Sequence, residues 1–463
     1  MYFERFFVRD LAQASYLIGC QQTGEALVVD PRRDTDIYIE TARREGLRIT
    51  QVTETHIHAD FQSGARELSE ETGAQLLLSD EGGADWHYRF AHHGLHGGDS
   101  FMVGNVRIDV LHTPGHTPEH LTFLITDTPA GDVPTMALTG DFVFVGAVGR
   151  PDLLEKAARV SGTQEAGARE LYHSLLRLQE QPDHLTLWPG HGAGSACGKA
   201  LGAVPSTTLG YERKTSPAFK AETEDDFVSQ VLDGQPEPPS YFGRMKVENR
   251  KGPALLHGLP RPAELSVDQL ATAAAEGVQL VDARSRQEFS VGHVAGSLNI
   301  QADEGFSTWA GWTLDSTRPV VLIAPEYRIE ELVRGLVRVG IDQVTGYFGD
   351  VQAWLDAGKE LRELPQVTPE ELNGRRSDVT VVDVRSRDEW DEGHISGALH
   401  VHVGELRDRL GEIPTGHPLV LHCESGDRST LGASILESMG VESVANLNGG
   451  IAAWKQDALP VTA

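Results

Sequence analysis

A stretch of fifteen residues occurs twice in this chain, 101 residues apart. The first copy covers residues 280–294 (LVDARSRQEFSVGHV) and the second covers residues 381–395 (VVDVRSRDEWDEGHI). Each copy starts as an apolar strand pattern and continues into a helical pattern, and a second strand and helix follow. A repeat of this kind predicts two domains that share one α/β fold with a parallel sheet. We place them at residues 265–362 and 363–463.

The residues before the repeat predict a separate domain. Short apolar strands alternate there with helical segments, as expected for a layered α/β domain. Six prolines without a clear period lie between residues 236 and 262, and such a segment is typical of a linker. We therefore expect a first domain at residues 1–245 and a linker at residues 246–264, which suits a chain of 463 residues.

Charge and cysteine usage exclude some function classes. The net charge of -28 argues against non-specific binding to nucleic acid or to an anionic membrane. No signal peptide and no apolar stretch long enough to cross a bilayer is recognisable. The three cysteines, Cys20, Cys197 and Cys423, are far apart and odd in number, which fits free thiols in a reducing cytoplasm.

The sequence THIHADF, residues 55–61, contains the first candidate metal site. It follows an apolar strand pattern at residues 47–52. Because side chains two apart in an extended chain point the same way, His56, His58 and Asp60 can converge on one point. Two imidazoles and a carboxylate crowded together favour a metal ion. The alternative is a polar loop that happens to contain two histidines.

Three further clusters lie at strand-to-loop junctions. They are HTPGHTPEH at residues 112–120, TGDF at 139–142 and WPGHG at 188–192. The turn formed by a Pro-Gly pair projects His116 from a strand end. Asp141 and His191 occupy the same kind of position, and a sheet can bring such strand ends together.

These four motifs, in this order and spacing, resemble the metallo-β-lactamase superfamily over roughly residues 10–215. The resemblance implies an α/β fold in which two sheets lie between helices, an αββα sandwich. It also implies a metal-binding cleft at one edge of that sandwich.

Phe61 distinguishes two branches of this superfamily. Zinc thioester hydrolases resembling glyoxalase II have a histidine there, which binds a second metal. Resemblance to the persulfide dioxygenases instead implies one Fe(II), with His56, His116 and Asp141 as ligands, a set associated with non-haem iron oxygenases. His58, Asp60 and His191 are then groups that orient the ligands, or ligands of a second metal. Zinc is the alternative metal.

Two regions are candidates for substrate contact. The sequence GRPD at residues 149–152 matches an element of the persulfide dioxygenases, and its Arg150 either holds a substrate carboxylate or pairs with Asp152. Tyr211 and Arg213 lie where glyoxalase-type enzymes contact the charged tail of a thiol cofactor.

Cys197 lies in a glycine-rich segment soon after His191. With Lys199 two residues on, its thiol is a candidate for a low-pKa acceptor in a sulfur relay. The alternative is a cysteine packed under a loop.

The second repeat contains Cys423 between an apolar strand and a helical pattern. Loop N–H groups and a helix N-terminus stabilise anionic sulfur in this setting, and Arg428 adds a positive charge. The pattern CxxxxR, with DVRxxxEWxxGHIxGA, resembles the rhodanese family and implies that Cys423 is a persulfide carrier. The predicted sulfur cradle consists of Glu424, Ser425, Gly426, Asp427 and Ser429.

The first repeat has no such nucleophile. Ala324 stands at the cysteine position, the loop is one residue shorter, and Pro325 removes an N–H. We interpret this copy as a pseudo-rhodanese whose role is structural or pocket-forming.

The whole chain resembles fusions of a persulfide dioxygenase with a pseudo-rhodanese and an active rhodanese. This implies oxidation of low-molecular-weight thiol persulfides by dioxygen to sulfite, conversion of sulfite to thiosulfate at Cys423, and a role in sulfide detoxification. Family habit predicts a homo-oligomer, either a dimer or a tetramer. A zinc thioester hydrolase fused to a sulfurtransferase is the alternative enzyme, and a docking module is a third hypothesis.

Overall fold

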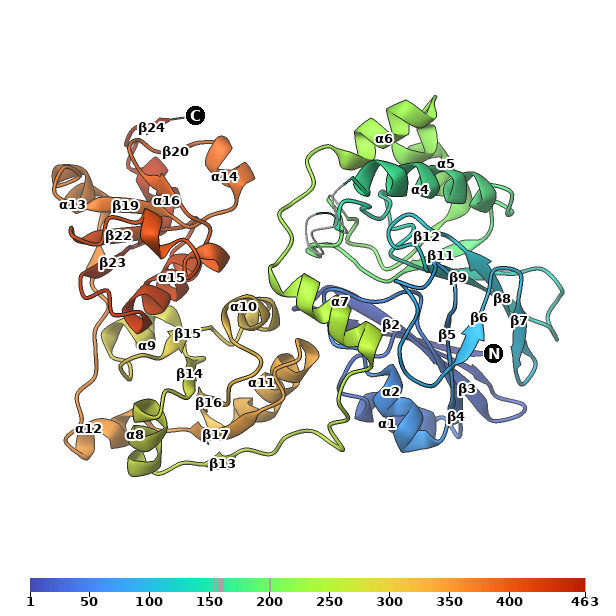
Figure 1. The fold of residues 1–463 in the computed structure, drawn as a ribbon, viewed down its shortest axis with the longest axis horizontal. Coiled ribbons are helices and arrows are strands. Elements are labelled where there is room, and N and C mark those ends of the chain that lie inside the picture. Colours follow the sequence, from blue (N-terminus) through green and yellow to red (C-terminus); the bar gives the residue numbers. More distant parts are fainter. Residues whose placement is uncertain (154, 156–161, 200, 463) are drawn as a thin grey trace. The chain divides into compact units, whose positions relative to one another are not determined.

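Two compact units make up the chain in the computed structural model, which describes residues 1–153, 155, 162–199 and 201–462 (Figure 1). The first unit contains residues 1–259 together with 337–340. The second contains residues 260–336 and 341–463.

Two six-stranded sheets form the first unit. In spatial order, the first sheet contains β1 (Tyr2–Val8), β2 (Gln13–Cys20), β3 (Glu25–Val29), β4 (Arg48–Thr53), β5 (Gln75–Ser79) and β6 (His93–Leu95). The second contains β12 (Thr207–Thr208), β11 (Thr186–Pro189), β10 (Met136–Gly140), β9 (Leu121–Asp127), β8 (Val106–His112) and β7 (Ser100–Val103).

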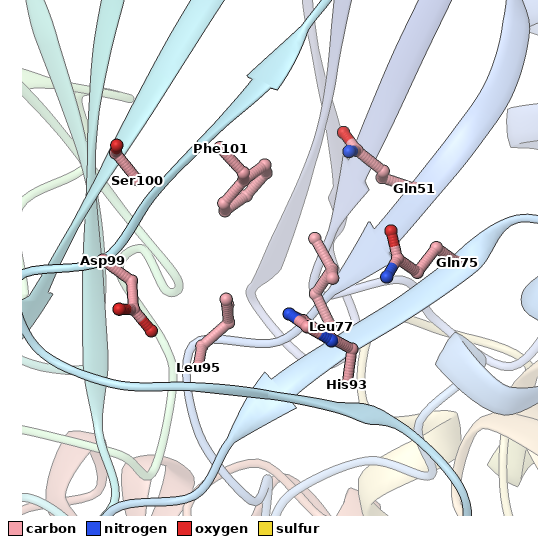
Figure 2. Close-up of a pocket in the computed structure, with 8 residues that line it drawn as sticks. All are labelled: Gln51, Gln75, Leu77, His93, Leu95, Asp99, Ser100 and Phe101. Carbon is pink, nitrogen blue, oxygen red and sulfur yellow. The ribbon is translucent and has the colours of Figure 1, made fainter.

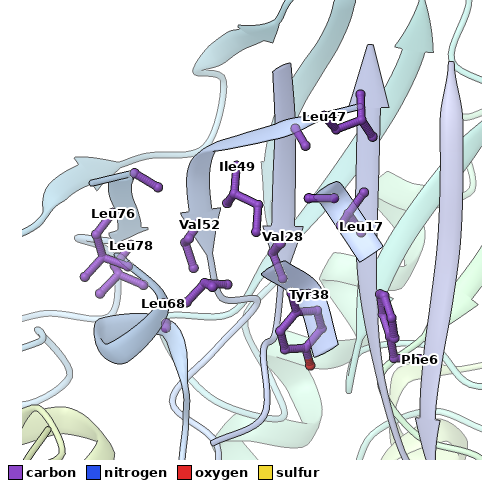
Figure 3. Close-up of a cluster of buried hydrophobic side chains, with 14 of the residues drawn as sticks. Phe6, Leu17, Val28, Tyr38, Leu47, Ile49, Val52, Leu68, Leu76 and Leu78 are labelled. Carbon is purple, nitrogen blue, oxygen red and sulfur yellow. The ribbon is translucent and has the colours of Figure 1, made fainter. Parts of the chain in front are cut away.

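Both faces of these sheets are buried, and strand periodicity explains how. On β2, Tyr16 and Ile18 point into the layer between the sheets, where they share a core with Ile108 of β8. Leu17 points to the opposite face and joins the core beneath the helices, which Figure 3 shows with Val28 and Tyr38. The alternation places successive residues of one strand in different cores.

Helices cover the outer faces of both sheets. They are α1 (Asp36–Arg44) and α2 (Ala65–Thr72) on the first sheet, and α4 (Gln164–Leu178), α5 (Leu209–Thr215), η1 (Ala218–Lys220) and α6 (Glu224–Leu232) on the second. This arrangement is the αββα sandwich that the sequence predicted.

The predicted linker begins too early. Helix α7 (Tyr241–Lys251) runs across the expected boundary at residue 245 and belongs to the first unit. Tyr241, Phe242, Met245 and Asn249 are its buried residues. Prolines lie on both sides of this helix, and they led to the prediction of a linker in place of a helix.

The second unit contains two five-stranded sheets, in each of which every pairing is parallel. The first has β13 (Ala263–Glu264), β17 (Val344–Phe348), β16 (Val320–Ile323), β14 (Gln279–Asp282) and β15 (Leu298–Asn299). The other has β18 (Gln366–Val367), β23 (Val444–Leu447), β22 (Leu419–His422), β19 (Thr380–Asp383) and β21 (Leu399–His400), and a small sheet pairs β20 (His394–Ile395) with β24 (Val461–Thr462).

Helices follow the strands in a corresponding order in both copies, except that two 3-10 helices replace one α-helix in the second copy. The first copy contains α8 (Val267–Ala275), α9 (Arg286–Val291), α10 (Phe306–Thr313), α11 (Glu326–Arg338) and α12 (Val351–Asp356). The second contains α13 (Pro369–Gly374), α14 (Arg387–Asp391), η2 (Val403–Glu405), η3 (Leu410–Glu412), α15 (Asp427–Ser438) and α16 (Gly450–Gln456).

The two copies share the same helix caps but differ in the segment that contains the predicted sulfur cradle. Helices α9 and α14 each begin with a reciprocal capping box, formed by Ser285 and Ser386 with the glutamate three residues on. In the second copy three residues separate Cys423 from α15, whereas only Pro325 separates Ala324 from α11. The repeat therefore specifies one fold twice, and the fold class predicted from the sequence is confirmed.

Candidate functional site

Three strand ends of the first unit bring His56, His116 and Asp141 together. His56 follows β4, His116 lies in the turn between β8 and β9, and Asp141 directly follows β10. The distance from Asp141 Oδ2 is 3.9 Å to His56 Nε2 and 3.6 Å to His116 Nε2. All three side chains are buried, and together they form a group that could hold one metal ion.

The remaining ring nitrogens set the direction of both imidazoles. His56 Nδ1 lies 2.9 Å from Thr55 Oγ1, and His116 Nδ1 lies 3.1 Å from the carbonyl oxygen of Arg150. Both Nε2 atoms are thereby turned towards Asp141, whose buried Oδ2 has no hydrogen-bond partner among the described residues. Two imidazole nitrogens and an unpartnered carboxylate oxygen fit a divalent metal.

Electrostatics keep the histidines in the form that binds metals. Burial, with a smaller contribution from neighbouring imidazoles, lowers the pKa of His56 well below its ordinary value. Burial also lowers the pKa of His116 to about 4, against the charge of Asp141. Neutral imidazole is the metal-binding species.

His191 lies between two carboxylates. Its Nδ1 is 2.6 Å from Asp141 Oδ1 and its Nε2 is 2.8 Å from Asp60 Oδ2. Burial alone would lower the pKa of His191, but the charges of Asp141 and Asp60 outweigh it and raise that pKa well above the ordinary value. Both ring nitrogens are engaged, so His191 fixes Asp141 through Oδ1 and leaves Asp141 Oδ2 available to a metal ion.

His58 binds Asp30 rather than Asp141 through its Nε2, and its buried Nδ1 has no hydrogen-bond partner among the described residues. Its Nε2 lies 3.0 Å from Asp30 Oδ1, and its ring packs on Phe61 with 4.4 Å between the centroids. Asp30 also accepts hydrogen bonds from Thr55 N and Oγ1, at 2.7 and 2.9 Å. The contact with Asp30 supports an orienting role for His58. Asp30 itself was missed, although it directly follows an apolar strand as Asp141 does.

Two other residues that hold the site were not assigned from the sequence. His120 Nε2 accepts a hydrogen bond of 3.2 Å from the backbone N–H of Asp141, and its place in the HTPGHTPEH motif could have indicated it. Asn249 of α7 donates to the carbonyl oxygens of His58 and Phe61, both at 2.8 Å. No local pattern marks Asn249, because its partners lie nearly two hundred residues earlier.

The structure favours a bracing role for two of the three predicted substrate-contact residues, Arg150 and Arg213. Arg150 is fully buried and donates to both carboxylate oxygens of Asp152, at 2.8 and 2.7 Å, and to the carbonyl of Ala196. This is the ion-pair alternative considered for it. Arg213 pairs with Asp183 and donates to backbone carbonyls, while Tyr211 is exposed.

Cys197 differs from the prediction of a low-pKa thiol. It is buried, and its Sγ lies within 4.8 Å of ligand atoms of Asp60 and His191. Burial and the negative charges of Asp60 and Asp141 raise the pKa of this thiol well above its ordinary value. Lys199 does not compensate, since its ammonium group binds the carbonyl oxygen of Asp233.

The predicted sulfur site in the second unit is formed at the start of α15. Cys423 Sγ accepts hydrogen bonds from Gly426 N at 3.1 Å and from Ser429 Oγ at 3.4 Å. Ile451 N donates to the carbonyl oxygen of Cys423 at 2.9 Å, which anchors the loop from α16. Five residues were predicted to form the sulfur cradle. Among the hydrogen bonds of the described residues, those of Gly426 and Ser429 reach the sulfur atom.

Arg428 has a partner that the sequence analysis missed. Its guanidinium donates to both oxygens of Glu389, at 2.6 and 2.7 Å. Burial lowers the pKa of Arg428, but the hydrogen bond to Glu389 and the negative charge of Cys423 together raise it. Glu389 therefore fixes the direction of the cation beside the sulfur.

Two hollows lie outside these sites. One, of about 250 Å³, opens between the edges of the two sheets of the first unit, where Gln51, His93 and Phe101 line it (Figure 2). The other, of about 550 Å³, lies beside His112 and Pro114. Neither is lined by His56, His116 or Asp141.

Comparison with known families separates the chain into the same parts. Residues 8–191 match the model of the metallo-beta-lactamase superfamily, and residues 266–357 and 368–457 each match the rhodanese-like domain. A solved structure of a metallo-beta-lactamase from Staphylococcus aureus is 41% identical, with a TM-score of 0.70, over 75% of this chain and 98% of that chain.

Curated relatives of the first unit include both persulfide dioxygenases and hydroxyacylglutathione hydrolases. The mitochondrial persulfide dioxygenase ETHE1 of Bos taurus is 31% identical over 230 residues, which are 47% of this chain and 75% of the relative. A hydroxyacylglutathione hydrolase of Nitrosococcus oceani is 41% identical over 116 residues, 25% of this chain and 43% of the relative. Identity by itself therefore does not separate an oxygenase from a hydrolase.

The length and apolar character of the helices bear on whether the chain could span a membrane. None in the described part of the chain is both long enough and apolar enough to cross a membrane.

Proposed function

We propose that this chain, which belongs to the metallo-beta-lactamase superfamily and carries two rhodanese-like domains, is a persulfide dioxygenase coupled to a sulfurtransferase. The net reaction at the first site is RSSH + O₂ + H₂O → RSH + SO₃²⁻ + 2H⁺. Cys423 then transfers sulfane sulfur to sulfite and releases thiosulfate. Such chemistry removes sulfide that has been captured as a thiol persulfide.

One observation carries the proposal. One of the two candidate metal groups among the described residues consists of two imidazoles and one carboxylate, and the position that would supply a further imidazole is occupied by Phe61, which is fully buried. Two histidines and one carboxylate on one face of a metal are characteristic of non-haem Fe(II) oxygenases. The contact of His191 with Asp141 Oδ1 leaves Asp141 Oδ2 as the third ligand atom.

A ferrous ion in this site would supply the electron transfer that dioxygen activation needs. The protein's own contribution is to hold His56 and His116 neutral and to aim their Nε2 atoms at Asp141 Oδ2. The buried setting of these groups limits the access of water.

Sulfur transfer at Cys423 needs no metal. The thiolate takes the outer sulfur of a persulfide, Cys–S⁻ + RSSH → Cys–SS⁻ + RSH, and passes it on, Cys–SS⁻ + SO₃²⁻ → Cys–S⁻ + S₂O₃²⁻. The N–H of Gly426 and the hydroxyl of Ser429 are the groups that stabilise the charge on sulfur in both anionic forms.

A zinc thioester hydrolase remains the second candidate because hydrolases are among the relatives. A dinuclear site would need a ligand at position 61 and a free nitrogen on His58 or His191. Phe61 provides no ligand atom, and both nitrogens of His191 bind carboxylates. Nδ1 of His58 has no hydrogen-bond partner among the described residues, so Phe61 is the residue that disfavours a dinuclear site.

Dioxygen uptake by protein loaded with Fe(II) and supplied with glutathione persulfide tests the proposal. We expect uptake matched by sulfite plus thiosulfate, and no uptake by zinc-loaded protein. Zinc-dependent hydrolysis of an acyl-glutathione without any dioxygen uptake would contradict the proposal and support the hydrolase. The proposal further expects a homo-oligomer in the cytoplasm. The three free thiols of the chain support a reducing compartment.

A further inference from the structure

The loop of the active rhodanese copy is contacted by the inactive copy. Arg286, the first residue of α9, donates from Nη1 to the carbonyl oxygen of Ser425, and its Nε lies 3.3 Å from Asp427 Oδ1. Both acceptors belong to the segment between Cys423 and the first turn of α15. The two copies lie in the same compact unit, and Figure 1 shows α9 beside α15.

A second residue of the inactive copy strengthens this contact. Gln301 Nε2 donates to Asp427 Oδ1 at 3.1 Å, and Gln301 Oε1 accepts from the backbone N–H of Arg286 at 2.9 Å. Asp427 Oδ2 is occupied by Ser425 Oγ at 2.6 Å. The tip of the loop is thus held through its main chain at Ser425 and through the carboxylate of Asp427.

Gly426 shows how closely Arg286 approaches the loop. Gly426 has φ of +116°, a conformation that favours glycine. A Cβ atom at this position would lie against Nη1 of Arg286. The N–H of this same glycine donates to Cys423 Sγ at 3.1 Å, so the residue held beneath the guanidinium is the one that aims a donor at the sulfur.

The repeat provides an internal comparison. Arg387 occupies the equivalent position in α14, 101 residues later, where it is also the first residue after a capping serine. Its guanidinium is mostly exposed and pairs with Asp391 one turn along the same helix. Of these two arginines, only Arg286 therefore reaches the loop that follows Cys423, although the local sequences around Arg286 and Arg387 are alike.

We propose that Arg286 is a positioning residue for sulfur transfer, and that the inactive copy is retained because it holds the Cys423 loop in its sulfur-binding conformation. The inference rests on the proposed reaction at Cys423. Arg286 acts through the loop backbone at Ser425 and the carboxylate of Asp427, both of which it holds in place.

Transfer of sulfur from thiosulfate to cyanide tests this with the full chain, because that reaction needs no metal. It proceeds as Cys–S⁻ + S₂O₃²⁻ → Cys–SS⁻ + SO₃²⁻ and Cys–SS⁻ + CN⁻ → Cys–S⁻ + SCN⁻. We expect Arg286→Gln to lower kcat roughly tenfold while KM for thiosulfate changes less than about twofold. Arg286→Lys should recover part of the loss, and the matched control Arg387→Gln should behave as wild type.

A second measurement does not depend on turnover. The rate at which iodoacetamide alkylates Cys423, followed by peptide mass, should change in Arg286→Gln and stay unchanged in Arg387→Gln. Equal kinetics and equal alkylation in the two variants would overturn the inference. A raised KM with unchanged kcat would also overturn it, since Arg286 would then bind the anion directly. If the wild-type chain forms no thiocyanate, the proposed function of Cys423 fails, while the alkylation rates still decide whether Arg286 positions the loop.

Discussion

The ring of Phe61 packs against the ring of His58, with 4.4 Å between their centroids. Phe61 is fully buried, and His58 is bonded on its other side to Asp30. An apolar ring therefore occupies the position at which the hydrolase pattern has a metal ligand. Phe61 lies in the loop of residues 55–63, which we call the metal loop. Because Phe61 cannot bind a metal, this residue limits the number of metals that the site is proposed to hold.

Replacing Phe61 by histidine should raise the metal content. We expect wild-type protein to bind one metal per chain, and Phe61→His to bind more than one when it is loaded with zinc, because it restores an imidazole next to Asp60. Elemental analysis of dialysed protein measures this. Phe61→Leu is the control for altered packing and should stay at one, whereas two metals in the wild type would contradict the mononuclear assignment.

The ion pair of His58 predicts a pH dependence in the metal-free protein. Burial lowers the pKa of His58, but the charge and hydrogen bond of Asp30, with Glu54 and Asp60, outweigh burial and raise the pKa to about 9. The folded state therefore holds this proton more tightly than the unfolded chain does. The resulting stabilisation, about 3 kcal/mol at most, is complete below pH 6.5 and is lost as the pH rises through 9.

Thermal unfolding of metal-free protein between pH 6 and pH 10 measures this effect. The difference in unfolding temperature between wild type and His58→Gln should shrink as the pH rises. A difference that stays constant over this range would show that His58 is not charged in the folded protein.

Loss of Asn249 should weaken the metal loop from outside the metal site. Its side chain donates to His58 and Phe61 and accepts from Gln62 Nε2 and Ser63 N, at 3.0 and 2.9 Å. Asn249→Ala leaves these buried groups without partners, which costs about 2–4 kcal/mol. We expect a lower unfolding temperature for the first unit and weaker metal binding.

The neighbouring substitution Glu248→Gln is a matched control for Asn249→Ala. Glu248 lies on the same helix and is half-buried, and its ion pair with Arg244 is local. It should leave metal affinity unchanged. Equal metal affinity in the two variants would mean that α7 does not support the loop.

A cysteine alone should not restore the inactive copy. Ala324→Cys in a Cys423→Ser background places a thiol after β16, but α11 starts at Glu326 and Pro325 has no N–H to donate. We expect no thiocyanate formation above that of Cys423→Ser, measured with thiosulfate and cyanide. Dioxygen uptake should persist in both variants. Recovery of sulfur transfer would show that the three-residue loop is dispensable.

Several parts of the candidate site were predictable from local sequence. His56, His116 and Asp141 each follow a strand within a few residues, so strand periodicity and Pro-Gly turn chemistry determine where they point. The loop from Cys423 to Arg428 is also local, because a strand, a short turn and a helix N-terminus are sufficient to form it. The domain types follow from the repeat and from the four motifs.

Other roles depended on contacts between distant segments. Arg150 was left between two interpretations, and its burial against Asp152 supports the structural one. Cys197 was also left between two interpretations, and the structure supports the packed cysteine, since Lys199 binds the carbonyl of Asp233 and burial with nearby carboxylates raises the pKa of the thiol. Adjacent residues of a loop can face different environments, and sequence distance does not measure this.

The sequence by itself determined the two fold types, the three strand-end ligand candidates, the absence of a ligand at Phe61 and the position of the proposed sulfur nucleophile. Only the tertiary structure decided that Asn249 supports the metal loop and that Arg286, rather than its repeat counterpart Arg387, reaches the loop of Cys423. The physical reason is that backbone geometry is encoded over a few residues, whereas the partner of a side chain depends on which surfaces pack together.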